Sequence, residues 1–233
     1  MLNNVKNTAI PNILDLLAPH ICRGCGKTGK VVCECCKKNI ISTHQNFCPF
    51  CKKPNQTGAC QNCHNLPPIF IVGNRSSLIG ILAHDFKYYS IRALKNPLAE
   101  ILNQVLPDID GKISIVPLPT TAAHIRQRGL DHTYLIAKQL AKLRSKNYRV
   151  EKLLLRTKNT VQVGADRKTR FSQAQDAYSI NHKIKIDSNA TYILFDDVWT
   201  TGASMLSAIK KLRESGATKI IIAILALSTL EDK

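Results

Sequence analysis

The stretch Tyr192–Ser204, YILFDDVWTTGAS, decides how the C-terminal half of the chain is organised. Three apolar residues lead into two adjacent aspartates, Asp196 and Asp197, and a Thr-Thr-Gly turn follows before a predicted helix. Two neighbouring carboxylates repel each other, and an apolar strand solvates them poorly. The pair therefore needs a partner, and the identity of that partner bears on what the protein does.

Predicted strands and helices alternate on both sides of this stretch. We expect strands over residues 113–116, 191–195 and 219–227, a helix capped by Asp131, and a helix over residues 203–215 that ends before Gly216. Such alternation predicts an α/β fold, with a parallel sheet covered by helices on both faces. The polar segment Arg156–Tyr178 has little periodicity, and a long polar loop in a compact domain is usually functional or disordered.

The order of strand, acids, turn and helix indicates a phosphate site. Asp196 and Asp197 end a predicted parallel strand, where open α/β sheets bind ligands. Thr200–Ser204 then begins a helix whose free N–H groups and dipole favour phosphate, and Gly202 permits close approach of the backbone. A phosphate beside two carboxylates describes a phosphorylated sugar, and magnesium would relieve the repulsion between the acids. The alternative is two solvated acids that merely cap a strand.

All nine cysteines lie between Cys22 and Cys63. Eight of them form four Cys-x-x-Cys pairs: Cys22/Cys25, Cys33/Cys36, Cys48/Cys51 and Cys60/Cys63. This density predicts two structural zinc sites of four thiolates each, in sequential or cross-braced pairing, with Cys35 left over. A thioredoxin-like redox motif, the alternative, would show one such pair within a βαβ unit.

The charge of the chain is strongly positive. It has 33 Lys and Arg against 16 Asp and Glu, a formal net charge of +17, which two four-thiolate zinc sites would lower to about +13. Such a balance indicates polyanionic partners, or else a basic proteome. The longest aliphatic run, residues 220–227, is too short to span a membrane, and the N-terminus does not read as a secretion signal. We therefore expect a cytoplasmic protein without a membrane span.

Beyond these patterns, the sequence resembles a known family. ILFDDVWTTGAS resembles the phosphoribosyl-pyrophosphate (PRPP) signature of type I phosphoribosyltransferases, and the whole chain resembles the ComF proteins of the ComFC/GntX type. NILDLLAPHICRGCG, VPLPTTAAHIRQRGLDHTYLIA and QVGADRKTRFSQAQDAY resemble, in turn, their first zinc knuckle, pyrophosphate-loop region and following basic segment. The resemblance implies an N-terminal helix and double zinc-ribbon module over residues 1–65 and a phosphoribosyltransferase-like domain over residues 66–233.

This resemblance also implies roles for individual residues. The acids would hold the ribose hydroxyls of PRPP and the Thr-rich turn its 5′-phosphate, which gives these PRPP-binding candidates: Asp196, Asp197, Val198, Thr200, Thr201, Gly202, Ala203, Ser204, Pro117, Leu118 and Pro119. In an enzyme, Arg128 and Arg170 would join the two acids as catalytic residues, and Arg126 and the loop 156–170 would help magnesium to neutralise the leaving pyrophosphate. A base or nucleophile site is not recognisable, and His84, His124 and His132 are candidates only by elimination.

A second interpretation makes the protein a handler of nucleic acid. Between Thr120 and Arg170 we count 13 Lys and Arg against 3 acids, a net charge of +10. The nucleic-acid-binding candidates are Arg126, Arg144, Lys146 and Lys158, and the aromatic residues that could stack on bases, or pack in the core, are Tyr134, Tyr148, Phe171 and Tyr178. The ComF resemblance favours this interpretation, because ComF proteins are associated with handling single-stranded transforming DNA in the cytoplasm.

We therefore expect a ComF-like competence protein that binds PRPP with magnesium and assists uptake of single-stranded DNA, with a competence helicase as a candidate partner. The alternative is a metabolic type I phosphoribosyltransferase, similar to an amidophosphoribosyltransferase, acting on an unidentified base or amine. The sequence leaves open whether any transfer reaction takes place.

Overall fold

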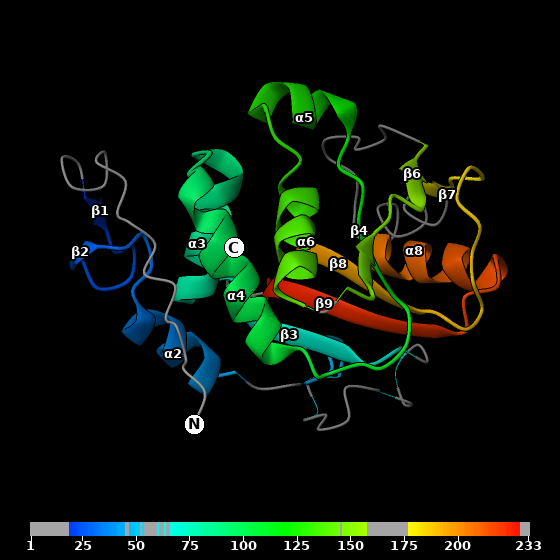
Figure 1. The fold of residues 1–233 in the computed structure, drawn as a ribbon, viewed down its shortest axis with the longest axis horizontal. Coiled ribbons are helices and arrows are strands. Elements are labelled where there is room, and N and C mark those ends of the chain that lie inside the picture. Colours follow the sequence, from blue (N-terminus) through cyan, green and yellow to red (C-terminus); the bar gives the residue numbers. More distant parts are fainter. Residues whose placement is uncertain are drawn as a thin grey trace, which may run out of the picture.

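A five-stranded parallel sheet forms the centre of the computed structural model, which describes residues 19–44, 47–51, 53, 60, 63, 66–144, 146–157 and 177–228. The strand order is β3-β9-β8-β4-β5 (Figure 1). The strands are β3 (Ile69–Asn74), β4 (Ile113–Pro117), β5 (Tyr148–Val150), β8 (Thr191–Trp199) and β9 (Lys219–Leu227). The predicted strands are confirmed, but β8 runs on through both aspartates to Trp199.

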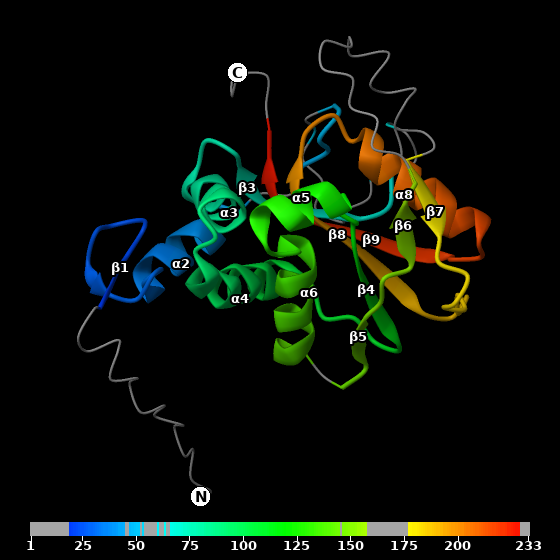
Figure 2. The ribbon, with the colours of Figure 1, turned by 90° about the horizontal axis from the view of Figure 1, so that it is seen from above.

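Helices cover both faces of this sheet (Figure 2). On one face lie α2 (Glu34–Ser42), α3 (Leu78–Tyr88), α4 (Lys95–Val105) and α6 (His132–Leu143), and on the other lies α8 (Ala203–Glu214). The predicted α/β class with a parallel sheet between helices is thus confirmed. Among the described helices, none combines the length and the apolar character that crossing a bilayer requires.

Shorter elements complete the fold. They are β1 (His20–Ile21), β2 (Thr28–Gly29), the 3-10 helix η1 (Arg92–Leu94), α5 (Ala122–Arg128), β6 (Leu154–Arg156) and β7 (Tyr178–Ile180). Strands β6 and β7 pair antiparallel and flank the polar segment, whose residues 158–176 lie outside the described part of the chain.

The helix boundaries follow the signals in the sequence. Asp131 caps α6, because its side chain accepts a hydrogen bond from the Tyr134 N–H at 3.2 Å. Helix α8 follows Gly202 and ends just before Gly216, which has a φ of +99°. Local capping chemistry therefore sets the start of α6 and the end of α8.

The first part of the cysteine-rich segment packs against α3 and α4. Ile40 of α2 belongs to the same buried core as these helices. Lys37 pairs with Glu100 of α4 at 2.5 Å, and Arg23 pairs with the buried Asp85 of α3 at 2.5 Å. The division at residues 65 and 66 stays a prediction, and the expected N-terminal helix falls on residues 1–18, outside the described residues.

Arg144 completes the C-terminal end of α4. Its guanidinium donates to the carbonyl oxygens of Asn103, Leu106 and Pro107 at 2.7, 2.9 and 2.9 Å. The Asn103 and Leu106 carbonyls belong to the end of α4, where a helix leaves carbonyls without intrahelical partners, and Pro107 follows the helix. The side chain is only 8% exposed, so Arg144 joins α4 to the end of α6 rather than presenting a free charge.

Replacing Arg144 with alanine should therefore destabilise the fold. The carbonyls would lose a charged donor while remaining close to the core, and we expect a loss of about 2–3 kcal/mol in the free energy of unfolding. Urea titration followed by circular dichroism measures this change. Lys142→Ala, an exposed change in the last turn of α6, is the matched control and should cost less than about 0.5 kcal/mol. Equal effects of the two changes would contradict the capping role.

Candidate phosphoribosyl site and cysteine clusters

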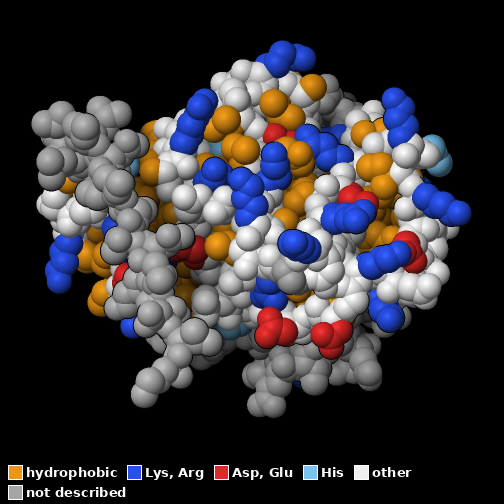
Figure 3. Space-filling view, viewed as in Figure 1, with side chains coloured by type: hydrophobic (Ala, Val, Ile, Leu, Met, Phe, Trp, Pro, Cys, Tyr) orange, Lys and Arg blue, Asp and Glu red, His pale blue; other side chains and the backbone are white. Residues whose placement is uncertain are grey.

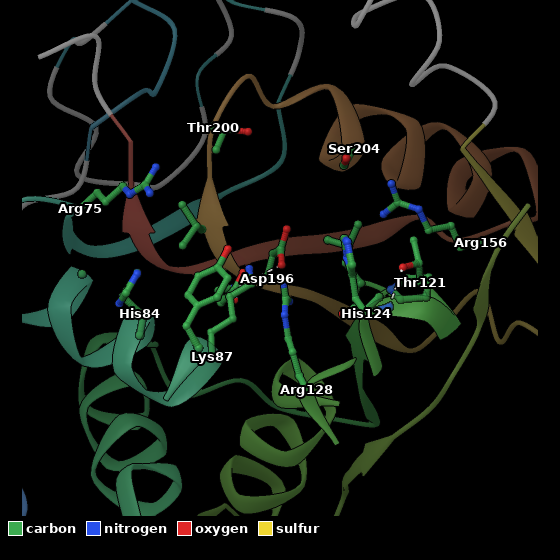
Figure 4. A pocket seen from close by; sticks show the side chains of 18 of the residues that line it. Arg75, His84, Lys87, Thr121, His124, Arg128, Arg156, Asp196, Thr200 and Ser204 are labelled. Atoms are coloured by element: carbon green, nitrogen blue, oxygen red, sulfur yellow. Dashed lines mark hydrogen bonds and ion pairs between the residues drawn. The ribbon is translucent and has the colours of Figure 1, made fainter. Parts of the chain in front are cut away.

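A cavity of about 330 Å³ opens at the carboxyl ends of the parallel strands. Its walls come from α3, the β4–α5 loop, α5, the β6–β7 pair, the end of β8 and the start of α8. Asp196 lies in the middle of this cavity, with Lys87 on one side and Arg156 on the other (Figure 4). The fold thus brings the acids to the edge of the sheet where ligands bind in open α/β folds.

Asp197 faces a cation that the sequence did not reveal. Because side chains alternate along a strand, Asp197 shares the side of Phe195, which packs in the core with α3. There the Asp197 carboxylate lies 2.7 Å from the ammonium group of Lys87, near the C-terminal end of α3. Its backbone N–H donates to a carboxylate oxygen of Asp196 at 2.9 Å. One of the two acids is thus neutralised within the protein.

The ionised form of the remaining acid, Asp196, is electrostatically unfavourable in the ligand-free protein. Burial and the neighbouring Asp197 carboxylate raise the pKa of Asp196 well above its ordinary value, although Lys87 acts in the opposite direction. Burial alone would lower the pKa of Lys87, but the acid pair raises it, so the ammonium group stays charged. A ligand that donates hydrogen bonds or brings a cation to Asp196 would favour the ionised form.

Lys87 is the main residue that the sequence analysis missed. It lies in α3, and no motif distinguishes it from other surface lysines. Arg75, Tyr88 and Thr121 also line the cavity without having been predicted. A prediction of α3 as a helix leading to the carboxyl edge of the sheet would have pointed to Lys87 and Tyr88, and Thr121 lies in the segment that resembles a pyrophosphate loop.

The Thr-Thr-Gly turn lies beside the acids as expected. Thr200 and Ser204 line the cavity, as does Val198 at the end of β8. Gly202 has a φ of +78°, and an added Cβ would come within 2.4 Å of the Trp199 ring. Only glycine therefore fits this turn, both for its backbone conformation and for its contact with the indole.

Other residues of the turn shape it rather than line the cavity. The Thr201 hydroxyl accepts a hydrogen bond from the Ala203 N–H at 3.4 Å, and Ala203 is buried as the first residue of α8. Neither residue is among those that line the cavity.

The segment expected to meet pyrophosphate forms the opposite wall. Leu118 and Pro119 line the cavity, whereas Pro117 is the last residue of β4 and lines only a neighbouring cavity. Arg128 of α5 also lines the acid-pair cavity, and Arg126 is exposed on the same helix without lining it. The two arginines therefore have different surroundings.

Of the three candidate histidines, two line the wall of the cavity and one is buried in the core. His84 and His124 line the cavity, and the pKa of His124 is lowered by burial and by nearby cations, which keeps its imidazole neutral. His132 is buried below the cavity against Phe86, where burial lowers its pKa as well. None of these contacts supplies a nucleophile.

The predicted nucleic-acid contacts do not share one surface. Lys146 lies in the turn before β5, at the end of the sheet opposite the cavity, and Arg144 is occupied at α4. Lys158, Arg170 and Phe171 fall outside the described residues. Lysines and arginines outnumber acids over the visible face in Figure 3. Only Arg126, among the four candidates, is both described and near the cavity.

The eight paired cysteines form two clusters in sequential pairing. One contains Cys22, Cys25, Cys33 and Cys36, and the other contains Cys48, Cys51, Cys60 and Cys63. The sulfur atoms within each cluster lie within 4.8 Å of one another, and tetrahedral zinc would place them about 3.8 Å apart. The donor sets therefore fit two zinc ions, and Cys35 is an exposed residue that belongs to neither cluster.

The pKa values of the thiols within the clusters also favour binding of a cation. Burial opposes ionisation of Cys22, but backbone N–H groups, led by that of Cys33, lower the pKa of its thiol to about 6. The Lys53 backbone N–H lowers the pKa of Cys51 to about 7. Burial and neighbouring sulfurs raise the pKa of Cys36, so a full set of thiolates requires a bound cation.

The second cluster is joined to the Thr-Thr-Gly turn by aromatic packing. Phe50, between Cys48 and Cys51, contacts Trp199 edge-to-face at a centroid distance of 5.7 Å. Trp199 in turn packs against Gly202. Disturbing this cluster should therefore alter the surroundings of the Trp199 ring.

Metal loss can be followed cluster by cluster, because Trp199 is the single tryptophan of the chain. We expect Cys60→Ser to lose about one zinc ion per chain and to shift Trp199 emission to the red as its packing loosens. Cys22→Ser should also lose about one ion but leave the emission unchanged. Metal analysis and fluorescence test this, and Cys35→Ser should change neither. Full zinc content in both cluster variants would refute the two-site prediction.

The raised pKa of Asp196 predicts a pH effect on stability. Since the folded protein holds this proton more tightly than the unfolded chain, the carboxyl group lowers stability as pH rises above the ordinary value of 3.8. Asp196→Asn should remove this part of the pH dependence, so that the ligand-free variant gains stability relative to the parent between about pH 5 and about pH 8.

Asp187→Asn provides a control of opposite sign. The Asn189 N–H and Lys112 lower the pKa of Asp187, so that its ionised form stabilises the fold above the ordinary pKa and its stabilising effect is lost in acid. Denaturant titrations of both variants at several pH values give the comparison. If both variants changed the pH dependence of stability in the same direction, burial of Asp196 would not have the proposed effect.

The chain is similar in sequence to two competence proteins over most of its length. The chain is 28% identical over 216 residues to Competence protein F of Haemophilus influenzae, covering 85% of this chain and 92% of that protein. It is 24% identical over 205 residues to Competence protein ComFC of Bacillus subtilis, covering 82% and 81% respectively. No family model matches the sequence.

One similar solved structure is that of the allosteric regulatory enzyme of purine biosynthesis, with a TM-score of 0.38 and 14% identity over 61% of this chain and 30% of that one. That likeness is too weak to bear on function. The two sequence relatives, by contrast, match more than four fifths of the chain. Together they confirm the resemblance of this chain to the ComF family.

Proposed function

We propose that this protein takes part in DNA uptake during natural transformation, and that it binds PRPP or a related phosphoribosyl ligand with magnesium while handling single-stranded DNA. The observation that carries the proposal is the acid-pair cavity. It combines one carboxyl group paired with Lys87, a second carboxyl group of raised pKa, a turn at a helix N-terminus, and surrounding cations. The names of the two relatives supply the connection to competence.

Each wall of the cavity suits one part of a phosphoribosyl ligand. Asp196, once ionised, would accept hydrogen bonds from the ribose hydroxyls. The turn Thr200–Ser204 would hold the 5′-phosphate through backbone N–H groups and hydroxyls. Arg128 and Arg156, which also line the cavity, would face the diphosphate. The relation of these groups in Figure 4 supports a ligand that extends across the cavity from Ser204 to Arg128.

Magnesium has a limited role in this proposal. Asp196 and the phosphate oxygens of the ligand are hard oxygen donors of the kind that magnesium prefers, and the ion would reduce their mutual repulsion. Asp197 already has Lys87 at 2.7 Å, so we assign the metal to Asp196 and the ligand. Arg170 remains a proposed participant from outside the described residues.

The cations at the carboxyl edge of the sheet support binding of a nucleic-acid strand. Arg75 and Arg128 line the cavity and Arg126 is exposed on α5 beside it. We leave Arg144 out of the proposed surface because the α4 carbonyls occupy its guanidinium. Lys158 stays in it as a prediction. A competence helicase is the proposed partner, and the cytoplasm, where thiolate clusters persist, is the proposed location.

A second cavity favours a metabolic transferase as the alternative. It measures about 420 Å³ and shares Leu118, Pro119 and Arg156 with the acid-pair cavity. An acceptor base or amine could occupy it next to a bound ribose. In that case the chain would be a type I phosphoribosyltransferase similar to an amidophosphoribosyltransferase.

The double change Asp196→Asn and Asp197→Asn distinguishes binding of PRPP from binding of single-stranded DNA. It preserves side-chain size but removes the Asp196 carboxylate, which would bind ribose and magnesium, together with the anionic partner of Lys87. We expect the affinity for PRPP with magnesium to fall by about 10²-fold, because one or two charge-assisted hydrogen bonds are lost. Binding of a single-stranded oligonucleotide should hold or tighten slightly, since two negative charges leave a basic edge. Calorimetry with PRPP and fluorescence anisotropy with labelled oligothymidylate give the two affinities.

The matched basic variants are Arg126→Ala near the cavity and Lys146→Ala at the opposite end of the sheet. Arg126→Ala should weaken DNA binding and lower its salt dependence by up to about 0.7 slope units per lost phosphate contact. Lys146→Ala should have a smaller effect. If the protein shows no affinity for single-stranded DNA at low salt, the nucleic-acid part of the proposal is wrong and the transferase becomes the better account.

A further inference from the structure

Two exposed tyrosines stand at the C-terminal end of α3. Tyr88 is the last residue of the helix and Tyr89 follows it, with 54% and 67% of their surfaces exposed. His84, one turn earlier, lies 4.7 Å from the Tyr88 ring and 5.6 Å from the Tyr89 ring, measured between centroids. Three ring systems therefore form one cluster on the surface.

This aromatic cluster adjoins the acid-pair cavity. His84 and Tyr88 themselves line the cavity, and His84 shares a wall with Lys87 (Figure 4). The Arg128 guanidinium lies 4.8 Å from the Tyr88 ring centroid. The aromatic surface is thus continuous with a cavity whose cations attract phosphate.

The turn after the helix fixes the position of the cluster. Ser90 has a φ of +53°, a left-handed conformation uncommon for a residue with a side chain. Its hydroxyl donates to the Arg128 carbonyl at 3.4 Å, which joins the end of α3 to the end of α5. Tyr88 and Arg128 are therefore held from two directions.

Those aromatic residues expected to stack on bases that the structure describes are less accessible. Tyr148 and Tyr178 are buried, at 8% and 3% exposure, and thus follow the core-packing alternative. The ring of Tyr134 has the ammonium group of Lys152 at 4.0 Å from its centroid. Of the tyrosines that line the cavity in the described part of the chain, Tyr88 is exposed and Tyr178 is buried, and Tyr89 is the exposed neighbour of Tyr88.

We propose that His84, Tyr88 and Tyr89 form a stacking platform for an unpaired nucleobase of single-stranded DNA, whose adjoining phosphate lies at the cavity beside Arg128. The inference rests on the proposed handling of single-stranded DNA. Bases of any identity can stack, because each has a π-face, so the platform supplies affinity without sequence preference. Arg128 serves both parts of the nucleotide, since it contacts the Tyr88 ring and lines the cavity.

The double change Tyr88→Ala and Tyr89→Ala tests the platform, and Tyr88→Phe with Tyr89→Phe is its matched control. The probe is an oligothymidylate that carries one 2-aminopurine, whose fluorescence falls when the base stacks. A second probe of equal length carries abasic sites in place of the bases. We expect the alanine variant to bind the normal strand about 5- to 100-fold more weakly and to lose the fluorescence change. The phenylalanine variant should keep both, because its rings still stack.

Binding of the abasic strand separates the contribution of base stacking to the affinity from that of charge. The parent and the alanine variant should bind it equally, since they share the same cations. If the parent binds single-stranded DNA and the alanine variant binds it as tightly, with an unchanged fluorescence signal, the platform is refuted while the proposed function stands. If the parent binds no strand at low salt, both fail. Free 2-aminopurine that competes at micromolar concentration would assign the platform to a free base instead, and would overturn the inference.

Discussion

The ion pair between Lys87 and Asp197 is the interaction on which the candidate site depends. Two adjacent carboxyl groups at the end of a largely buried strand would repel each other, and α3 supplies one cation at 2.7 Å from Asp197. This leaves Asp196 as a single carboxyl group of raised pKa, poised for a ligand that favours its ionised form. The sheet, α3 and the start of α8 must all be in place for this asymmetry to exist.

The cysteine-rich segment supports the cavity from two sides. The Arg23 guanidinium, next to the first cluster, pairs with Asp85 of α3, two residues before Lys87. From the second cluster, Phe50 packs on Trp199, which limits position 202 to glycine. Metal binding in either cluster would thus stabilise a wall of the cavity as well as a small module with few aliphatic residues. This arrangement gives a physical reason for joining the two parts in one chain.

Much of this architecture follows from local patterns. The apolar runs predicted β4 and β9, Asp131 and Gly216 marked helix ends, and the four Cys-x-x-Cys pairs predicted two four-sulfur clusters. Pairing of the knuckles was not predictable, because both arrangements suit short loops. Lys87 was missed and Arg144 was misassigned for another reason. Each is an ordinary cation in the sequence, and its partner, Asp197 for Lys87 and the α4 carbonyls for Arg144, lies far away along the chain.

The central claim is that the acid-pair cavity binds a phosphorylated ribose through ionised Asp196, and calorimetry of PRPP binding tests it most directly. Titrations at one neutral pH, with magnesium, in two buffers of different ionisation enthalpy report both affinity and proton release. The account predicts saturable binding of about one PRPP per chain, with release of a proton from Asp196 that makes the heat depend on the buffer. Absence of saturable binding in both buffers would contradict it.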